Sequence, residues 1–173
     1  MGLDKIFDSK VVCVIIPGDK FNKKIIEIVK KVKNEKICYV TLNKGVDILI
    51  ESFKKNKINT KNFFFIDGVS KTIFSPKPVE YCNFISSPNA LTEISLAIEK
   101  CLDSGFSTVL VDSLSIFMIY HNAEVINHFF HNLSNKIRSE NNKKLILILS
   151  DKDKDSEVFK KIEVIVDKVI ELK

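Results

Sequence analysis

Short apolar runs recur along the chain and alternate with longer stretches in which apolar residues are spaced as on one face of a helix. The clearest run, Val11–Ile16, contains no charged residue and is typical of a strand that is buried on both faces. Further runs of this kind are Lys36–Leu42, Asn62–Ile66, Thr108–Val111 and Leu145–Leu149. Because strands and helices alternate, the pattern predicts a mainly parallel sheet that is covered by helices on both faces.

Helices are predicted where apolar residues recur three and four positions apart between these runs. The first follows Pro17-Gly18. The others cover Val46–Lys55, Asn89–Leu102, the stretch from Ser113 to about Arg138, and Ser156–Lys161. For the helix over Asn89–Leu102, Ser87 is a typical N-cap, Pro88 suits the first helical position, and Gly105 ends the helix. A single turn of helix is expected within Met1–Lys10.

Two parts of the chain are less regular. Two prolines within Val69–Val79 prevent regular strand pairing, so this segment is predicted as an irregular connection that leads to a short strand over Tyr81–Ile85. At the other end, Val164–Val166 and Val169–Leu172 are predicted to pair as a short hairpin or strand pair. The sequence therefore predicts one α/β domain over residues 1–173, a three-layer sandwich whose mainly parallel sheet has an antiparallel C-terminal edge.

Composition supports a globular protein with a substantial core. Of the 173 residues, 45% are hydrophobic and 28% are charged, which is typical of a folded domain and not of a disordered chain. No early apolar segment resembles a signal peptide, and no window has the length of a membrane span. The four cysteines are scattered without a C-x-x-C pair, so neither a zinc site nor a disulfide framework is expected and the predicted location is the cytoplasm.

The net charge of +5 comes almost entirely from lysine, because Arg138 is the only arginine. Arginine is the residue that makes bidentate contacts with phosphates and base edges, whereas lysine supplies a point charge. The lysines also alternate with acidic residues along the predicted helices. They are therefore interpreted as solvated helix faces, and a nucleic-acid-binding surface is the less favoured alternative.

The turn after Val11–Ile16 is the first candidate for a binding site. A strand that passes through a tight turn into a helix places helix amides and the helix dipole where α/β proteins bind phosphate. A working phosphate loop has the pattern G-x-x-x-x-G-K-[ST], whereas this turn is Pro17-Gly18-Asp19-Lys20-Phe21-Asn22. The architecture of a phosphate site is thus predicted, but most of its chemistry is missing.

Polar residues also follow the other predicted strands, as Asn43-Lys44, Asp67-Gly68, Asp112-Ser113 and Ser150-Asp151. The carboxyl ends of parallel strands form the edge at which such sheets bind ligands. Turns need polar residues in any case, so this clustering alone does not define a site. For Asp112, a structural role as a carboxylate that caps the next helix is favoured over a metal-binding role.

The order of these elements, with CYVTLN on the second strand and TVLVDSLS on a later one, resembles the RecA superfamily, in particular the KaiC-like ATPase domains of archaea. The resemblance covers most of the chain. It implies a first strand that leads into the phosphate loop and a glutamate after the second strand that activates the attacking water. It also implies an aspartate after the later strand that helps to hold magnesium.

Position by position, the chain departs from this family pattern in the loop. Pro17-Gly18 matches the proline and glycine of the family's loop, and Asp112-Ser113 matches the magnesium aspartate and the serine that follows it. Lys20, however, stands in place of the next glycine, Phe21 in place of the lysine, and Asn22 in place of the serine or threonine. The loop side chains that would bind phosphate and supply the metal-binding hydroxyl are therefore lost.

The catalytic glutamate of the family falls near Asn43, whose amide cannot take a proton from water. Phosphoryl transfer depends on positioned charge, so loss of the base, the loop lysine and the metal-binding hydroxyl leaves little of it. The resemblance therefore implies a degenerate nucleotide pocket without catalytic residues, bound ATP or a metal site. This pocket is formed by Gly18, Lys20, Asn43, Asp112 and Ser113.

Three histidines mark a second region of interest. At a rotation of about 100° per residue, His121, Glu124, His128 and His131 fall within one arc of the predicted long helix. Zinc binding is one alternative for this face, but the sequence indicates no further ligand from another element. A polar outer face or a subunit contact is favoured instead.

The leading hypothesis is a catalytically inactive RecA/KaiC-like domain that acts as a regulatory or scaffold protein through protein contacts. RecA-type domains commonly self-assemble, so the resemblance also implies a homo-oligomer or a complex with another protein. One alternative is a switch that binds a nucleotide without hydrolysing it, through Lys20 or Lys23 and Asp112. A DNA-associated RecA-type paralogue and an active ATPase with an unusual loop are further alternatives.

Overall fold

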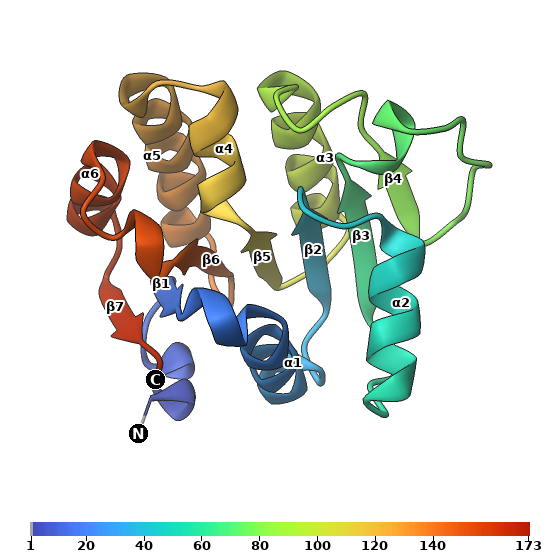
Figure 1. Ribbon diagram of the computed structural model, residues 1–173, viewed down its shortest axis with the longest axis horizontal. Helices are drawn as coiled ribbons and strands as arrows, with labels where there is room; N and C mark the ends of the chain where they lie inside the picture. Colours follow the sequence, from blue (N-terminus) through green and yellow to red (C-terminus); the bar gives the residue numbers. More distant parts are fainter. Residues whose placement is uncertain (1) are drawn as a thin grey trace.

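The computed structural model describes residues 2–173 and is built around one sheet of seven strands. The strand order is β4-β3-β2-β5-β6-β1-β7, and every neighbouring pair is parallel (Figure 1). The strands are β1 (Val11–Ile16), β2 (Ile37–Thr41), β3 (Phe63–Asp67), β4 (Cys82–Phe84), β5 (Thr108–Asp112), β6 (Lys144–Ser150) and β7 (Lys168–Glu171). The apolar runs of the sequence therefore form strands as predicted.

Six α-helices and four short 3-10 helices connect these strands. The α-helices are α1 (Phe21–Val32), α2 (Val46–Lys55), α3 (Leu91–Asp103), α4 (Leu114–Tyr120), α5 (Ala123–Ser139) and α6 (Glu157–Ile165). The 3-10 helices are η1 (Leu3–Asp8), η2 (Gly18–Lys20), η3 (Ser70–Thr72) and η4 (Asp151–Asp153). Across residues 2–173, no helix is both long enough and apolar enough to cross a membrane.

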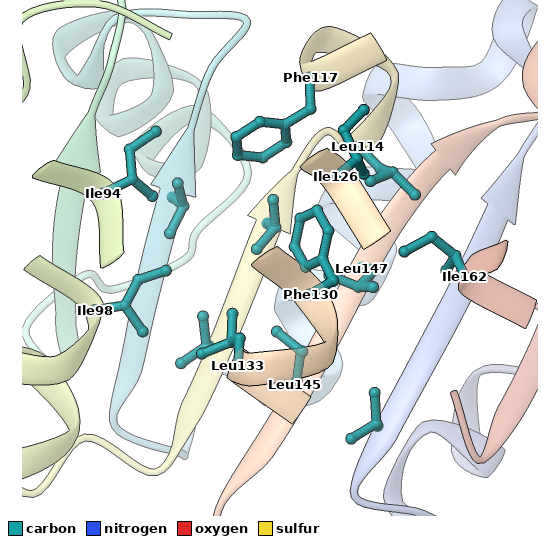
Figure 2. Packing of buried hydrophobic residues seen from close by; sticks show 14 of the residues in the cluster. Ile94, Ile98, Leu114, Phe117, Ile126, Phe130, Leu133, Leu145, Leu147 and Ile162 are labelled. Atoms are coloured by element: carbon teal, nitrogen blue, oxygen red, sulfur yellow. The ribbon is translucent and has the colours of Figure 1, made fainter. Parts of the chain in front are cut away.

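The sheet separates two apolar cores. On one face, α1 and α2 bury Ile28 and Phe53 against β1, β2 and β3. On the other face, α3, α4, α5 and α6 cover the sheet, and Figure 2 shows Ile98, Phe130 and Ile162 of this second core. All residues of β1, β2 and β5 are buried because helices cover both of their faces. The predicted three-layer α/β sandwich is thus confirmed.

The C-terminal end of the sheet differs from the prediction. β7 lies parallel to β1, with Val169 opposite Cys13, so the predicted antiparallel edge is wrong. The predicted strand at Val164–Val166 is wrong as well, because α6 continues to Ile165. Ser156 caps α6 by accepting a hydrogen bond from the amide of Phe159 at 3.1 Å. A helix between two strands returns the chain to the same end of the sheet, which makes the pairing of β7 with β1 parallel.

Asp167 holds the start of β7 against the start of β1. Its Oδ2 accepts hydrogen bonds from the amides of Lys10 at 3.1 Å and Val11 at 2.9 Å. Its Oδ1 accepts one from Nη2 of Arg138 at 2.7 Å. Burial alone would raise the pKa of Asp167, but the bond from Arg138 and the two amides outweigh burial and lower the pKa. The only arginine of the chain is therefore a structural residue.

The predicted long helix before Arg138 is in fact two helices, α4 and α5, with a break at His121. Asn122 is the N-cap of α5, and its side chain accepts a hydrogen bond from the amide of Val125 at 3.0 Å. Asparagine is a strong N-cap residue, but apolar residues at helical spacing continue on both sides of it. The pattern of apolar residues therefore predicted one continuous helix and not the break at His121.

The start of α3 also lies later than predicted. Its N-cap is Ala90, which makes no side-chain cap, and the first helical residue is Leu91. Ser87 instead bonds to the side chain of Asn89, so the predicted N-cap belongs to a turn that precedes the helix. The segment from 69 to 79 contains only η3 as a regular element, in agreement with the predicted irregular connection.

Candidate functional site

The residues of the predicted nucleotide pocket lie along the carboxyl edge of the sheet. Gly18 and Lys20 follow β1, Asn43 follows β2, and Asp112 ends β5. β2 is the direct neighbour of β5, whereas β6 lies between β5 and β1. The fold therefore brings Asn43 and Asp112 together, while Gly18 and Lys20 lie farther along the edge.

Asn43 and Asp112 line a small cavity together with Lys44, Asn22 and Phe21. Its volume is about 20 Å³, which is room for about one water molecule. Pockets for small-molecule ligands measure roughly 300–1,000 Å³. Phe21 is the first residue of α1, and its half-buried ring packs against the core beneath α1 and α2. This cavity is therefore far too small to hold a nucleotide.

Asp112 is the most unusual group in this region. It is 4% exposed, and its Oδ2 accepts a hydrogen bond from the hydroxyl of Tyr39 at 2.6 Å. Its Oδ1 is buried and has no hydrogen-bond partner among residues 2–173. Burial raises the pKa of Asp112, although the bond from Tyr39 and the charge of Lys44 oppose this effect. The predicted helix-capping role is wrong, because the carboxylate binds Tyr39 instead.

Tyr39 was not singled out by the sequence. Burial raises its pKa well above the ordinary value, and the neighbouring charge of Asp112 adds to this rise. The only sequence signal was a tyrosine inside an otherwise apolar strand, where a buried hydroxyl needs a partner. Ser113 follows Asp112 as the N-cap residue of α4, but its side chain makes no cap hydrogen bond and does not line the cavity.

Lys44 closes the cavity from the β2–α2 loop. Its Nζ donates a hydrogen bond to Oδ1 of Asn22 at 2.5 Å, which joins this loop to the first turn of α1. Its carbonyl oxygen accepts a hydrogen bond from Oγ1 of Thr41 at 2.5 Å. Asn22, the residue for which the sequence resemblance implied a metal-binding hydroxyl, is thus bound to a lysine. The nearby positive charge therefore comes from Lys44 and not from the loop after β1.

The turn after β1 is hydrogen-bonded to a carboxylate of the chain itself, Asp151. Residues Gly18–Lys20 form the single 3-10 turn η2, and the amide of Gly18 donates a hydrogen bond to Oδ1 of Asp151 at 3.0 Å. Asp151 follows β6, the neighbour of β1. A carboxylate therefore occupies this backbone donor, and the side chain of Lys152 lies beside the same glycine. Lys20 itself is exposed at the start of α1.

Asp67, at the end of β3, has a structural role. It is fully buried, and its two oxygens accept four hydrogen bonds, from the amides of Val46, Val69 and Ser70 and from the hydroxyl of Ser70, at 2.6–2.9 Å. The bond to Val46 caps the first turn of α2. Gly45 leaves room for this network, because a Cβ there would lie 2.8 Å from Oγ of Ser70.

The four residues of the predicted histidine face do not share one surface. His121 lies in the break between α4 and α5, and its Nε2 is buried without a hydrogen-bond partner in the described part of the chain. Glu124 and His128 border a groove beside α3, whereas His131 borders a separate depression with Arg138. No cluster of three or more metal-ligating side chains occurs among residues 2–173.

Neither a protein-family model nor a protein of curated function matches the sequence. Among solved structures, a KaiC-like protein from the hyperthermophilic archaeon Pyrococcus horikoshii OT3 is similar, with a TM-score of 0.60 and 16% sequence identity. The match covers 95% of this chain and 73% of that chain. The chain therefore shares the fold of this KaiC-like protein, which confirms the fold that the sequence resemblance predicted. At this identity the similarity shows the fold alone.

Proposed function

We propose that the protein is a catalytically inactive RecA/KaiC-like domain that works in the cytoplasm as a regulatory or scaffold protein through contacts with other protein chains. The observation that carries this proposal is the cavity of about 20 Å³ at Asp112, which is closed by Phe21, Asn22 and Lys44. An ATPase of this fold needs a phosphate loop, a metal-binding hydroxyl and a base at this edge of the sheet. This chain has packed side chains there.

The contact between Gly18 and Asp151 gives independent support. It is a bond between the loop and another strand end, and it lies outside the small cavity. Binding of a triphosphate would require both the displacement of Asp151 from the amide of Gly18 and the movement of Phe21. Each change breaks packing or hydrogen bonds that the folded chain already has, which favours a protein that binds no nucleotide.

Calorimetric titration of the full chain with ATP and magnesium tests this proposal. We expect no heat beyond dilution at nucleotide concentrations up to about 1 mM, and no steady-state release of phosphate. Asp112→Asn serves as the matched variant, because the change removes the charge that would hold magnesium but preserves the side-chain shape. Micromolar binding that disappears in Asp112→Asn would overturn the proposal, and so would phosphate release that disappears in the same variant.

One observation favours the nucleotide-binding switch as a second candidate. Oδ1 of Asp112 is buried and has no partner among the described residues, so a metal ion or a phosphate-bound magnesium would satisfy it. This candidate predicts that ATP raises the midpoint of thermal unfolding only when magnesium is present, without turnover. An unfolding midpoint that ATP and magnesium leave unchanged eliminates it.

A further inference from the structure

A groove of about 630 Å³ lies between α3 and α5 on the face of the sheet that α3–α6 cover. In Figure 1 both helices lie on this face of the sheet, with α4 drawn beside α5. The apolar part of the groove is formed by Leu91, Leu96, Ile98, Val125, Phe129 and Leu133. Leu96 is 61% exposed and Val125 is 40% exposed, so the groove continues onto the surface as apolar side chains.

The polar residues of α5 form one row along this groove. Glu124, His128, Asn132 and Lys136 follow one another at intervals of four residues, and all of them line the groove. Nδ2 of Asn132 lies 3.3 Å from Nδ1 of His128, as expected for neighbours in such a row. The row begins with a negative charge and ends with a positive one.

Neither end of the row is neutralised within the chain. Glu124 and Lys136 take part in none of the ion pairs formed by residues 2–173. The two residues are also separated by about 18 Å along the helix, because a helix rises 1.5 Å per residue. This separation exceeds the Debye length of roughly 8 Å at physiological salt, so the two charges hardly interact with each other.

The row is centred on Phe130, close to the middle of α5. Glu124 and Lys136 lie at equal distances along the sequence on either side of Phe130, and so do His128 and Asn132. In a two-fold symmetric interface, a residue that contacts a second residue of the partner is itself contacted in the reciprocal way. A row with opposite charges at equal distances from its centre is therefore complementary to an antiparallel copy of itself.

We infer that a second copy of this chain docks at the groove between α3 and α5, with the α5 helices of the two copies antiparallel. Glu124 of each copy then faces Lys136 of the other, and the apolar side chains of Leu96 and Val125 are covered. The antiparallel arrangement also places the positive end of one helix dipole beside the negative end of the other. This inference rests on the proposed function, because it names the surface and the partner of the protein contacts proposed there.

Other occupants fit the groove less well. A different protein chain places no symmetry requirement on the charges of α5, whereas a second copy does. An anionic membrane surface would favour an excess of lysine, but the charged side chains along the groove are Glu99, Glu124 and Lys136. The charge pattern therefore points to self-association.

Charge reversal at the two ends of the row tests the inference. Sedimentation of the full chain from 1 to 500 µM at low salt is expected to show a monomer–dimer equilibrium for the wild type. Glu124→Lys and Lys136→Glu each place like charges at both ends of the interface, so each is expected to weaken the dimer by about tenfold or more. The double variant E124K/K136E is expected to recover the wild-type dissociation constant to within about threefold.

Mixing the two single variants provides a second test that does not depend on the double variant. One variant then carries lysine and the other glutamate at both positions, so an equimolar mixture is expected to dimerise while neither variant does so alone at the same concentration. The matched control is E51K/K55E, which exchanges the charges of an ion pair on α2 on the opposite face of the sheet. This control is expected to leave dimerisation unchanged.

Two results would overturn the inference. One is a wild-type chain that stays monomeric up to 500 µM, which would assign the groove to a different occupant. The other is a dimer that neither single variant weakens, which would place the interface elsewhere. Thermal unfolding of each variant checks that it is folded, since the reversed charges oppose the dipole of α5. Neither result changes the calorimetric outcome with ATP, so a failure of this inference is distinguishable from a failure of the proposed function.

Discussion

The hydroxyl of Tyr39 lies 2.6 Å from Oδ2 of Asp112, and this is the only hydrogen bond that the buried Asp112 carboxylate makes among residues 2–173. At the same edge of the sheet, the buried carboxylate of Asp67 accepts four. A buried charge is costly unless hydrogen bonds replace its hydration. We therefore expect the two aspartates to have opposite effects on stability, although both end a buried parallel strand.

We expect Asp112→Asn to stabilise the protein at pH 7 by about 1 kcal/mol, because it removes an underpaired buried charge and retains an oxygen for Tyr39. Burial raises the pKa of Asp112 above its ordinary value of 3.8, so the folded state binds the proton more tightly than the unfolded state. This contribution to stability is full at low pH and is lost as the pH rises from 3.8 through the raised pKa. Urea unfolding at pH 5 and pH 7 measures both effects.

Asp67→Asn is the matched comparison, and the opposite result is expected. Asparagine offers one acceptor oxygen to donors from Val46, Val69 and Ser70, so buried amides lose their partner and the free energy of unfolding falls by about 2–4 kcal/mol. Urea unfolding of the two variants at pH 7 compares them directly. Equal destabilisation by both substitutions would contradict the distinction between the two carboxylates.

Tyr39→Phe is expected to lower the free energy of unfolding at pH 7 by about 1–3 kcal/mol, because both oxygens of the buried Asp112 are then unpartnered. The loss is expected to shrink at pH 5, where a carboxyl with a raised pKa is protonated in a larger fraction of molecules. In the Asp112→Asn background the same change removes a bond to a neutral group, so its effect is smaller. A double-mutant cycle gives this coupling, and additive effects would contradict it.

Most of the fold could be predicted because its strands carry local signals. The continuous apolar run Val11–Ile16 and the similar runs for β2, β3, β5 and β6 all form strands. The parallel direction of β7 could not be predicted, because it depends on the crossover through α6 and on the contacts of Asp167 with Lys10 and Val11. No local pattern in Val169–Leu172 encodes these distant partners.

The position of the candidate site could be predicted from the sequence, but the side chains that occupy it could not. Asn43 and Asp112 were expected at one edge of the sheet, and they line one cavity. The group that occupies the loop amide, Asp151, is separated from Gly18 by 133 residues, so the sequence of the loop does not reveal it. The closure by Lys44 and Asn22 is likewise a tertiary contact, formed only when the β2–α2 loop meets α1.

Asp167→Ala is expected to destabilise the protein by about 1–2 kcal/mol, because it removes the acceptor for Lys10, Val11 and Arg138. The value is modest because the Asp167 side chain is 35% exposed, which screens its ion pair. The pKa of Asp167 is lowered, so its contribution is present above the ordinary value of 3.8 and is lost as the pH falls through the lower folded-state pKa.

Urea unfolding from pH 7 to pH 2.5 follows this contribution, and the difference between Asp167→Ala and the wild type is expected to shrink toward the acid end. Glu171→Ala is the control, because Glu171 pairs with Lys154 at the surface and its loss is expected to cost less than about 0.5 kcal/mol. A pH-independent difference for Asp167→Ala would contradict the assigned role of its ionised form.

Phe21→Ala enlarges the small cavity beside Asp112 and is expected to destabilise the protein by about 1–3 kcal/mol, below the range for a fully buried phenylalanine because the ring is half-buried. Opening this space is not expected to create ATP binding, since Asp151 still occupies the amide of Gly18. In Phe21→Ala/Asp151→Asn the competing charge is gone, and weak binding of inorganic phosphate is expected at millimolar concentrations. Calorimetry measures both ligands, and ATP binding by Phe21→Ala alone would show that Asp151 is no barrier.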